Sequence, residues 1–134
     1  MIGADTVVAF KEKILEKPAD IIEAEHFLRM LSDEWHKVYT GVTMIHCLTG
    51  KKYQKVLVTE VRFRALSDIE IENYLSTYEW TDKAGGYGIQ GVGSILVEQI
   101  QGDFFNVMGL SPLVVYQGLQ SLGYDVLKHS RIER

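Results

Sequence analysis

The sequence lacks several features that would assign a protein to a particular class. It contains a single cysteine, Cys47, so no disulfide can form within the chain, which favours a reducing compartment. No apolar run approaches the roughly 20 residues that a membrane-spanning helix needs. The first residues also lack the basic region of a secretory signal. We therefore expect a cytoplasmic protein without a membrane partner, in which Cys47 is a buried apolar residue rather than a nucleophile.

An excess of basic residues is also missing. The chain carries 14 Lys and Arg against 18 Asp and Glu, for a net charge of −4. This balance argues against nucleic acid as a partner. It does not exclude nucleotides, because a phosphate site needs only a few local donors. The four histidines have no metal-ligand spacing and are expected at the surface or in the core.

The length of 134 residues fits one domain, residues 1–134, around one hydrophobic core. Asp20 with Glu23, and Ser67 with Glu70, show the spacing of helix capping boxes. Apolar residues at helical or alternating spacing complete the assignment. The expected elements are strands at 2–10 and 14–15, a helix at 21–32, a hairpin of 35–48 and 53–65 with a bulge near 59–60, a helix at 68–77, a strand at 95–100 and a helix at 112–122, with fraying from 128 to 134.

Asp5 lies beside Thr6 in the first expected strand, which we expect to be buried. A buried carboxylate is costly unless it is paired, hydrogen-bonded or bound to a metal. Two interpretations remain open for Asp5. It is either a strand-end residue that caps a neighbouring turn, or a metal ligand or base for an attacking water.

Lys17 precedes Pro18, and a proline disfavours the helical conformation of the residue before it. An extended Lys17 could direct its ammonium group into a cleft as a charge for phosphate. The alternative is an ordinary solvated lysine.

Residues 80–93 have no regular period and include five glycines between 85 and 93. Residues 86–91 match the dinucleotide fingerprint G-x-G-x-x-G, but no apolar strand precedes them and no helix follows, so we reject that interpretation. The glycines permit close backbone approach to a ligand. Lys83 could then donate to a phosphate, and Gln90 could hydrogen-bond a base or a metal-bound water.

Six segments in order resemble the Maf family of nucleoside triphosphate pyrophosphatases, and they extend over nearly the whole chain. They are Gly3–Val8, Leu15–Pro18, His36–Val42, Thr59–Phe63, Asp82–Gly91 and Gly102–Leu110. The resemblance implies an α/β fold with a mixed, mostly antiparallel sheet, flanked by helices and divided into two lobes by a central cleft.

The same resemblance implies an activity and a set of site residues. Family members hydrolyse a nucleoside triphosphate to the monophosphate and pyrophosphate with a divalent metal, Mg²⁺ or Mn²⁺. Asp5 matches the catalytic acidic residue and would also contact the metal. Thr6, Lys17, Lys83 and Gln90 are assigned to substrate binding. The tract from Asp82 to Gln90 resembles the branch that acts on dTTP and UTP rather than the branch that prefers 7-methyl-GTP.

Three departures from the family pattern shape the remaining expectations. The family's Ser-x-Ser-x-Arg-Arg loop has no counterpart, so we expect a chain truncated at the N-terminus that lacks the first strand and loop. The alternative function is then a catalytically impaired nucleotide-binding or interaction module, whose exposed sheet edge could favour a homodimer. Tyr78 stands where glycine is usual before the glutamate, and Ser111 separates Leu110 from Pro112.

Overall fold

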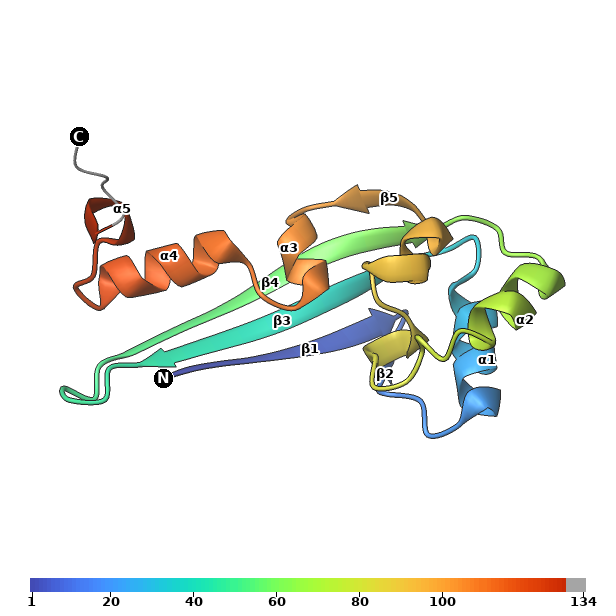
Figure 1. Cartoon of the computed structure of the whole chain (residues 1–134), viewed down its shortest axis with the longest axis horizontal. Helices are drawn as coiled ribbons and strands as arrows, with labels where there is room; N and C mark the ends of the chain where they lie inside the picture. The colour runs from blue at the N-terminus through green and yellow to red at the C-terminus, as the bar shows by residue number, and fades with distance from the viewer. Residues whose placement is uncertain (130–134) are drawn as a thin grey trace.

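The computed structural model describes residues 1–129 as a five-stranded sheet with helices packed against it (Figure 1). The strand order is β2-β1-β3-β4-β5, and all four pairings in this part of the chain are antiparallel. The α/β fold with a mostly antiparallel sheet flanked by helices is therefore confirmed. The elements are β1 (Ile2–Phe10), β2 (Lys13–Leu15), α1 (Ile21–Leu31), β3 (Trp35–Ile45), β4 (Lys52–Phe63), α2 (Asp68–Leu75), the 3₁₀ helices η1 (Ala84–Gly86) and η2 (Gly91–Leu96), β5 (Val97–Gln101), α3 (Phe104–Met108), α4 (Pro112–Ser121) and α5 (Val126–His129).

The long β3–β4 hairpin is the scaffold of the molecule. Its register runs from Trp35 opposite Arg62 to Ile45 opposite Lys52. The even-numbered residues of β3 from 36 to 44 are all buried, whereas the odd-numbered residues between them are partly or fully exposed. This period of two shows that the helices cover one face of the hairpin. Figure 1 shows α1 and α2 at one end of the hairpin, α4 at the other and α3 between them.

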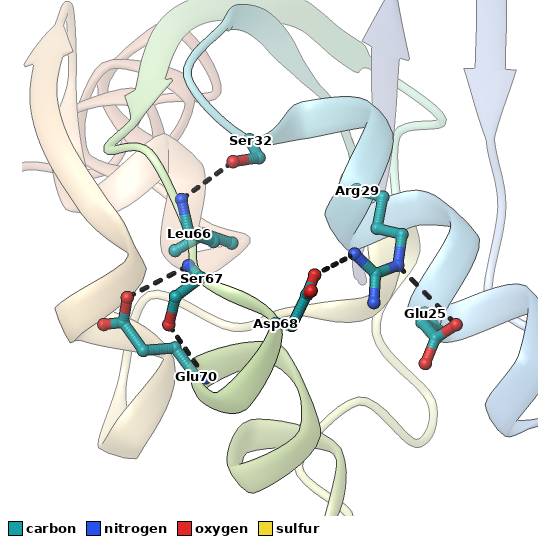
Figure 2. Close-up of polar contacts among 7 residues, drawn as sticks. All are labelled: Glu25, Arg29, Ser32, Leu66, Ser67, Asp68 and Glu70. Carbon is teal, nitrogen blue, oxygen red and sulfur yellow. Dashed lines mark hydrogen bonds and ion pairs between the residues drawn. The ribbon is translucent and has the colours of Figure 1, made fainter.

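Two side-chain caps fix the starts of α1 and α2, as the sequence predicts. Asp20 accepts a hydrogen bond from the Glu23 amide at 2.8 Å, although the Glu23 carboxylate returns to the Ala19 amide rather than to Asp20. Ser67 and Glu70 form a complete capping box (Figure 2). Satisfying these otherwise unpaired amides stabilises a helix start by about 1 kcal/mol for each cap.

Polar contacts then connect the two helices across their shared border. Arg29 on α1 binds Asp68 at 2.7 Å and Glu25 at 3.6 Å, and the Ser32 hydroxyl accepts from the Leu66 amide at 2.8 Å (Figure 2). These contacts hold the chain entering α2 against the end of α1.

The hydrophobic interior is divided into two clusters of unequal size. The large core joins β1, β3 and β4 to α1, α2 and residues 80–93, called the glycine loop below, and it includes Val8, Leu28, Phe63 and Tyr87. The small core lies under α4 and has three buried members, Val42, Met44 and Val114. The single core expected from the chain length is thus two clusters along one hairpin.

Four expectations need correction or restriction. Cys47 is exposed, because its apolar run ends in the turn at the tip of the hairpin. The register shift lies between Arg62 and Phe63 against β5, not at residues 59–60. The first half of β1 is exposed, so Asp5 does not lie in a buried strand. Residues 126–129 form α5, and the remainder of the expected frayed tail lies outside the described residues.

Within residues 1–129, no helix combines the length and apolar character required to cross a membrane.

Candidate active site

All five predicted site residues line one cavity of about 420 Å³. The residues are Asp5, Thr6, Lys17, Lys83 and Gln90. This volume falls within the range of small-molecule sites, roughly 300–1,000 Å³. The cavity is lined by β1, the segment before α1, β3, residues 78–90 and residues 107–109, so five separate parts of the chain must fold together to form it.

Strand β1 supplies Asp5 and Thr6 at the border of the cavity. The Thr6 hydroxyl lies 2.9 Å from the Thr40 hydroxyl on β3, which fixes its position on the helix-covered face. Alternation directs the Asp5 side chain to the other face of β1, and residues 2–7 pair with β3 alone among the described strands. Asp5 nevertheless lines the cavity. Its carboxylate accepts a hydrogen bond from the Thr6 amide at 3.0 Å. This contact lies within the strand, and it leaves carboxylate oxygen lone pairs for a ligand.

The two lysines approach the cavity from adjoining segments. The Gly85 amide donates to the Glu16 carbonyl at 3.2 Å, and this bond connects the glycine loop to the residue before Lys17. The alkyl chain of Lys83 packs beside Gly88, where an added Cβ would lie 3.3 Å from Cε. Among residues 1–129, neither lysine forms a salt bridge with a carboxylate. Both ammonium groups are therefore free of a fixed counter-charge within this part of the chain.

Two glycines of the loop allow other parts of the chain to pack closely against them. Gly85 has φ +72, and an added Cβ would approach the Val8 side chain to 3.1 Å. A Cβ on Gly93 would lie 2.0 Å from the Gly88 carbonyl oxygen, a distance that excludes every other residue type. The sequence predicts close approach of the glycines to a ligand, whereas at these two positions the neighbour is another part of the chain.

Glu79 fixes the loop beyond Gln90. Its carboxylate accepts hydrogen bonds from the Val92 amide at 3.1 Å and the Gly93 amide at 3.3 Å. Sequence reasoning did not assign Glu79 a role. The signal that could have identified it is its place shortly before a glycine-rich tract, because such a tract exposes many backbone amides that a carboxylate can bind.

Helix α3 forms another wall of the cavity with Val107 and Met108, together with Gly109 at its C-cap. Five residues are too few for a helix to be stable alone, so its position depends on tertiary contacts. The fully buried Asn106 provides them: its side-chain amide donates to the Val38 carbonyl at 3.1 Å and to the Thr59 hydroxyl at 2.9 Å. The Asn106 carbonyl accepts from Thr40 at 3.0 Å. A polar residue within the otherwise apolar Phe104–Met108 stretch was the available signal.

A buried pair stands behind the cavity. His36 Nε2 lies 2.5 Å from the hydroxyl of Tyr87, which lines the cavity. Burial lowers the pKa of His36 to about 4, because a desolvated imidazolium is unfavourable. Burial likewise raises the pKa of Tyr87. Both groups are thus uncharged at neutral pH, and His36 is a core residue rather than a metal ligand or surface residue.

The arginines of residues 62–64 take no part in this cavity. Arg62 binds Asp33 at 2.7 Å, and Arg64 binds Glu70 at 2.5 Å. The Arg64 bond is the largest cause that lowers the pKa of Glu70 to about 2. The cationic groups that line the cavity are therefore Lys17 and Lys83.

Comparison with protein families identifies the family of this chain. A family model described as Maf-like protein matches residues 1–122. The chain belongs to the Maf-like family. The match includes every residue that lines the cavity, the last of which is Gly109.

Three curated relatives of this Maf-like chain share one name. A dTTP/UTP pyrophosphatase of Pyrococcus furiosus is 51% identical over 127 residues, which are 94% of this chain and 65% of the relative. Proteins of the same name from Pyrococcus horikoshii and Halalkalibacterium halodurans are 49% and 51% identical, and they cover 92% and 93% of this chain. The chain spans 65% of the length of each of these relatives.

Proposed function

We propose that this Maf-like chain binds a nucleoside triphosphate, dTTP or UTP, and hydrolyses it to the monophosphate and pyrophosphate. One observation carries the proposal: Asp5, Thr6, Lys17, Lys83 and Gln90 line a single cavity of nucleotide-compatible size. The name shared by the relatives supports the choice of dTTP and UTP. The free ammonium groups and the Gln90 amide match the anionic and hydrogen-bonding parts of such a substrate.

Each side chain has a defined task in this reaction. Asp5 accepts a proton from a water molecule whose oxygen forms a bond to the α-phosphorus. The bond from that phosphorus to the bridging oxygen breaks, and pyrophosphate leaves with the bonding electrons. Lys17 and Lys83 stabilise the negative charge that develops on the leaving group. Gln90, held next to the segment that Glu79 anchors, orients the bound nucleotide.

The carboxylates of the cavity suit a metal ion that is also bound by the phosphates of the substrate. Glu79 is occupied by two loop amides, and residues 1–129 contain no cluster of three or more potential metal-ligating side chains. Mg²⁺ characteristically binds one or two carboxylates together with substrate phosphates, so Asp5 fits as its protein ligand. When bound, Mg²⁺ or Mn²⁺ would neutralise phosphate charge and favour ionisation of a water molecule.

The first experiment measures pyrophosphate release from dTTP and UTP with Mg²⁺ or Mn²⁺, and compares 7-methyl-GTP as a substrate. Asp5→Asn keeps the shape of the side chain but removes its charge, and we expect turnover to fall at least about 100-fold. Asp68→Asn is the matched control, because Asp68 is an exposed partner of Arg29 on α2 and does not line the cavity.

Equal turnover by the wild-type chain and Asp5→Asn would remove Asp5 from the mechanism. Binding of dTTP in calorimetry without pyrophosphate release by the wild type would overturn the hydrolytic function and leave a nucleotide-binding module.

A further inference from the structure

Tyr78 occupies a conformation that tyrosine rarely adopts. Its φ is +60, in the left-handed region, and it lies just after the end of α2. The turn itself needs this conformation, since the Tyr78 amide donates to Leu75 and the Tyr78 carbonyl accepts from Thr81. Glycine or asparagine would satisfy the same turn with less strain. A tyrosine at such a position is therefore a place to look for a role of the side chain.

The Tyr78 side chain lines the candidate active site and is 67% exposed. Of the large hydrophobic side chains around this cavity, only Tyr78 and Met108 are substantially exposed among the described residues. An exposed aromatic ring beside a cavity provides a flat apolar surface to a ligand. The lysines in the same cavity provide the opposite chemistry, a positive charge for phosphate.

Contact with Trp80 restricts where the Tyr78 ring can lie. The two ring centroids are 6.1 Å apart with an interplanar angle of 39°. Trp80 is itself immobilised, because it is 9% exposed and its indole N–H donates to the Leu75 carbonyl at 3.0 Å. This neighbour therefore limits the positions open to the ring before a ligand arrives, which reduces the entropy lost on binding.

We propose that Tyr78 is the surface on which the base of the nucleotide stacks, while Lys17 and Lys83 hold the phosphates. This inference rests on the proposed function and deepens it, because it assigns the base and the phosphates to different parts of the cavity. Stacking recognises the flat face of a base rather than its hydrogen-bonding edge. Tyr78 therefore contributes affinity for any nucleotide, and Gln90 remains available to contact the edge of the base.

The test compares two ligands that differ in the presence of a base. The KM for dTTP and the dissociation constant of inorganic tripolyphosphate are measured for the wild type, Tyr78→Gly and Tyr78→Phe. Tyr78→Gly removes the ring and relieves the backbone, so we expect roughly a tenfold higher KM for dTTP with the binding of tripolyphosphate unaltered. Tyr78→Phe retains the ring and should rescue the KM. Tyr124→Gly is the matched control, because Tyr124 is an exposed aromatic residue outside this cavity.

Thermal unfolding of Tyr78→Gly provides an independent check that its fold is retained. An unchanged KM for dTTP, or equal weakening of dTTP and tripolyphosphate, would overturn the stacking role and leave the hydrolytic function intact. If the wild type releases no pyrophosphate, the dissociation constant of dTTP from calorimetry replaces the KM. Weaker binding of dTTP to Tyr78→Gly than to the wild type and Tyr78→Phe would then support stacking without hydrolysis. Absence of dTTP binding to the wild type would overturn the stacking role.

Discussion

The two ends of the β3–β4 hairpin differ in what they bury and in what they contribute to the site. At one end, α1, α2 and the glycine loop enclose the large core, and the candidate active site borders it through Val8, Val38 and Tyr87. At the other end, α4 covers the small core and contributes no residue to the cavity. The larger hydrophobic core and the candidate active site therefore both lie at the α1 end of the hairpin. Substitutions at the two ends should therefore have separable effects.

The largest effect on stability is expected from Leu28→Ala. Leu28 is 0% exposed in the large core, and its truncation should lower the free energy of unfolding by about 4 kcal/mol through lost burial and a residual cavity. Urea unfolding followed by circular dichroism measures the change. Leu113→Ala on α4 is the control, since Leu113 is 58% exposed. A similar loss in both variants would contradict the assignment of stability to the large core.

A pH dependence should arise from His36, which packs edge-on against Phe63 and Tyr87 in the large core. Because its folded-state pKa of about 4 lies below the ordinary value of 6.5, the unfolded chain binds more protons between these pH values. Stability is therefore fully present above pH 6.5 and decreases as the pH falls towards 4, by about 3 kcal/mol in total.

Unfolding curves between pH 4 and 7 test this expectation. His36→Gln retains a hydrogen-bonding partner for Tyr87 and should flatten the dependence, whereas His26→Gln, at an exposed position on α1, should not. If the free energy of unfolding of His36→Gln still decreases as the pH falls from 6.5 to 4, groups other than His36 cause the dependence.

The smallest of the three effects is expected at the α4 end. Val114→Ala removes two methyl groups from the small core and should reduce the free energy of unfolding by about 2 kcal/mol. Pyrophosphate release from dTTP should remain at the wild-type rate, because Val114 does not line the cavity. Parallel measurement of unfolding and turnover checks both statements. A large loss of turnover below the unfolding transition would show that the two ends are coupled.

Features set by nearby residues were predictable from the sequence. Asp20 and Ser67 act on amides three residues away, so their caps could be recognised without knowledge of the fold. Ser111 similarly accepts from Val114 at the start of α4. The five predicted site residues also come together, because the segments that resemble the family fold around one cavity. Their roles in substrate binding and catalysis remain predictions.

Features set by distant residues were not predictable in the same way. The apolar residues around Cys47 suggested burial, but whether the tip of a hairpin is covered depends on how far α4 extends along it. Exposure of the first half of β1 likewise depends on which strands lie beside it. The partners of Asn106 were likewise not predictable, because both acceptors of its side-chain amide are more than 40 residues away in sequence.

The Asn106 side chain has a consequence for how the cavity responds to change elsewhere. It bridges a carbonyl of β3 and a hydroxyl of β4, so the spacing of these strands sets where α3 stands. A substitution that alters the twist of the hairpin would displace Met108 and Gly109 relative to Thr6 and thereby alter the shape of the cavity. The geometry of the cavity is therefore set in part by the sheet, and residues that do not line the cavity can alter which ligands fit it.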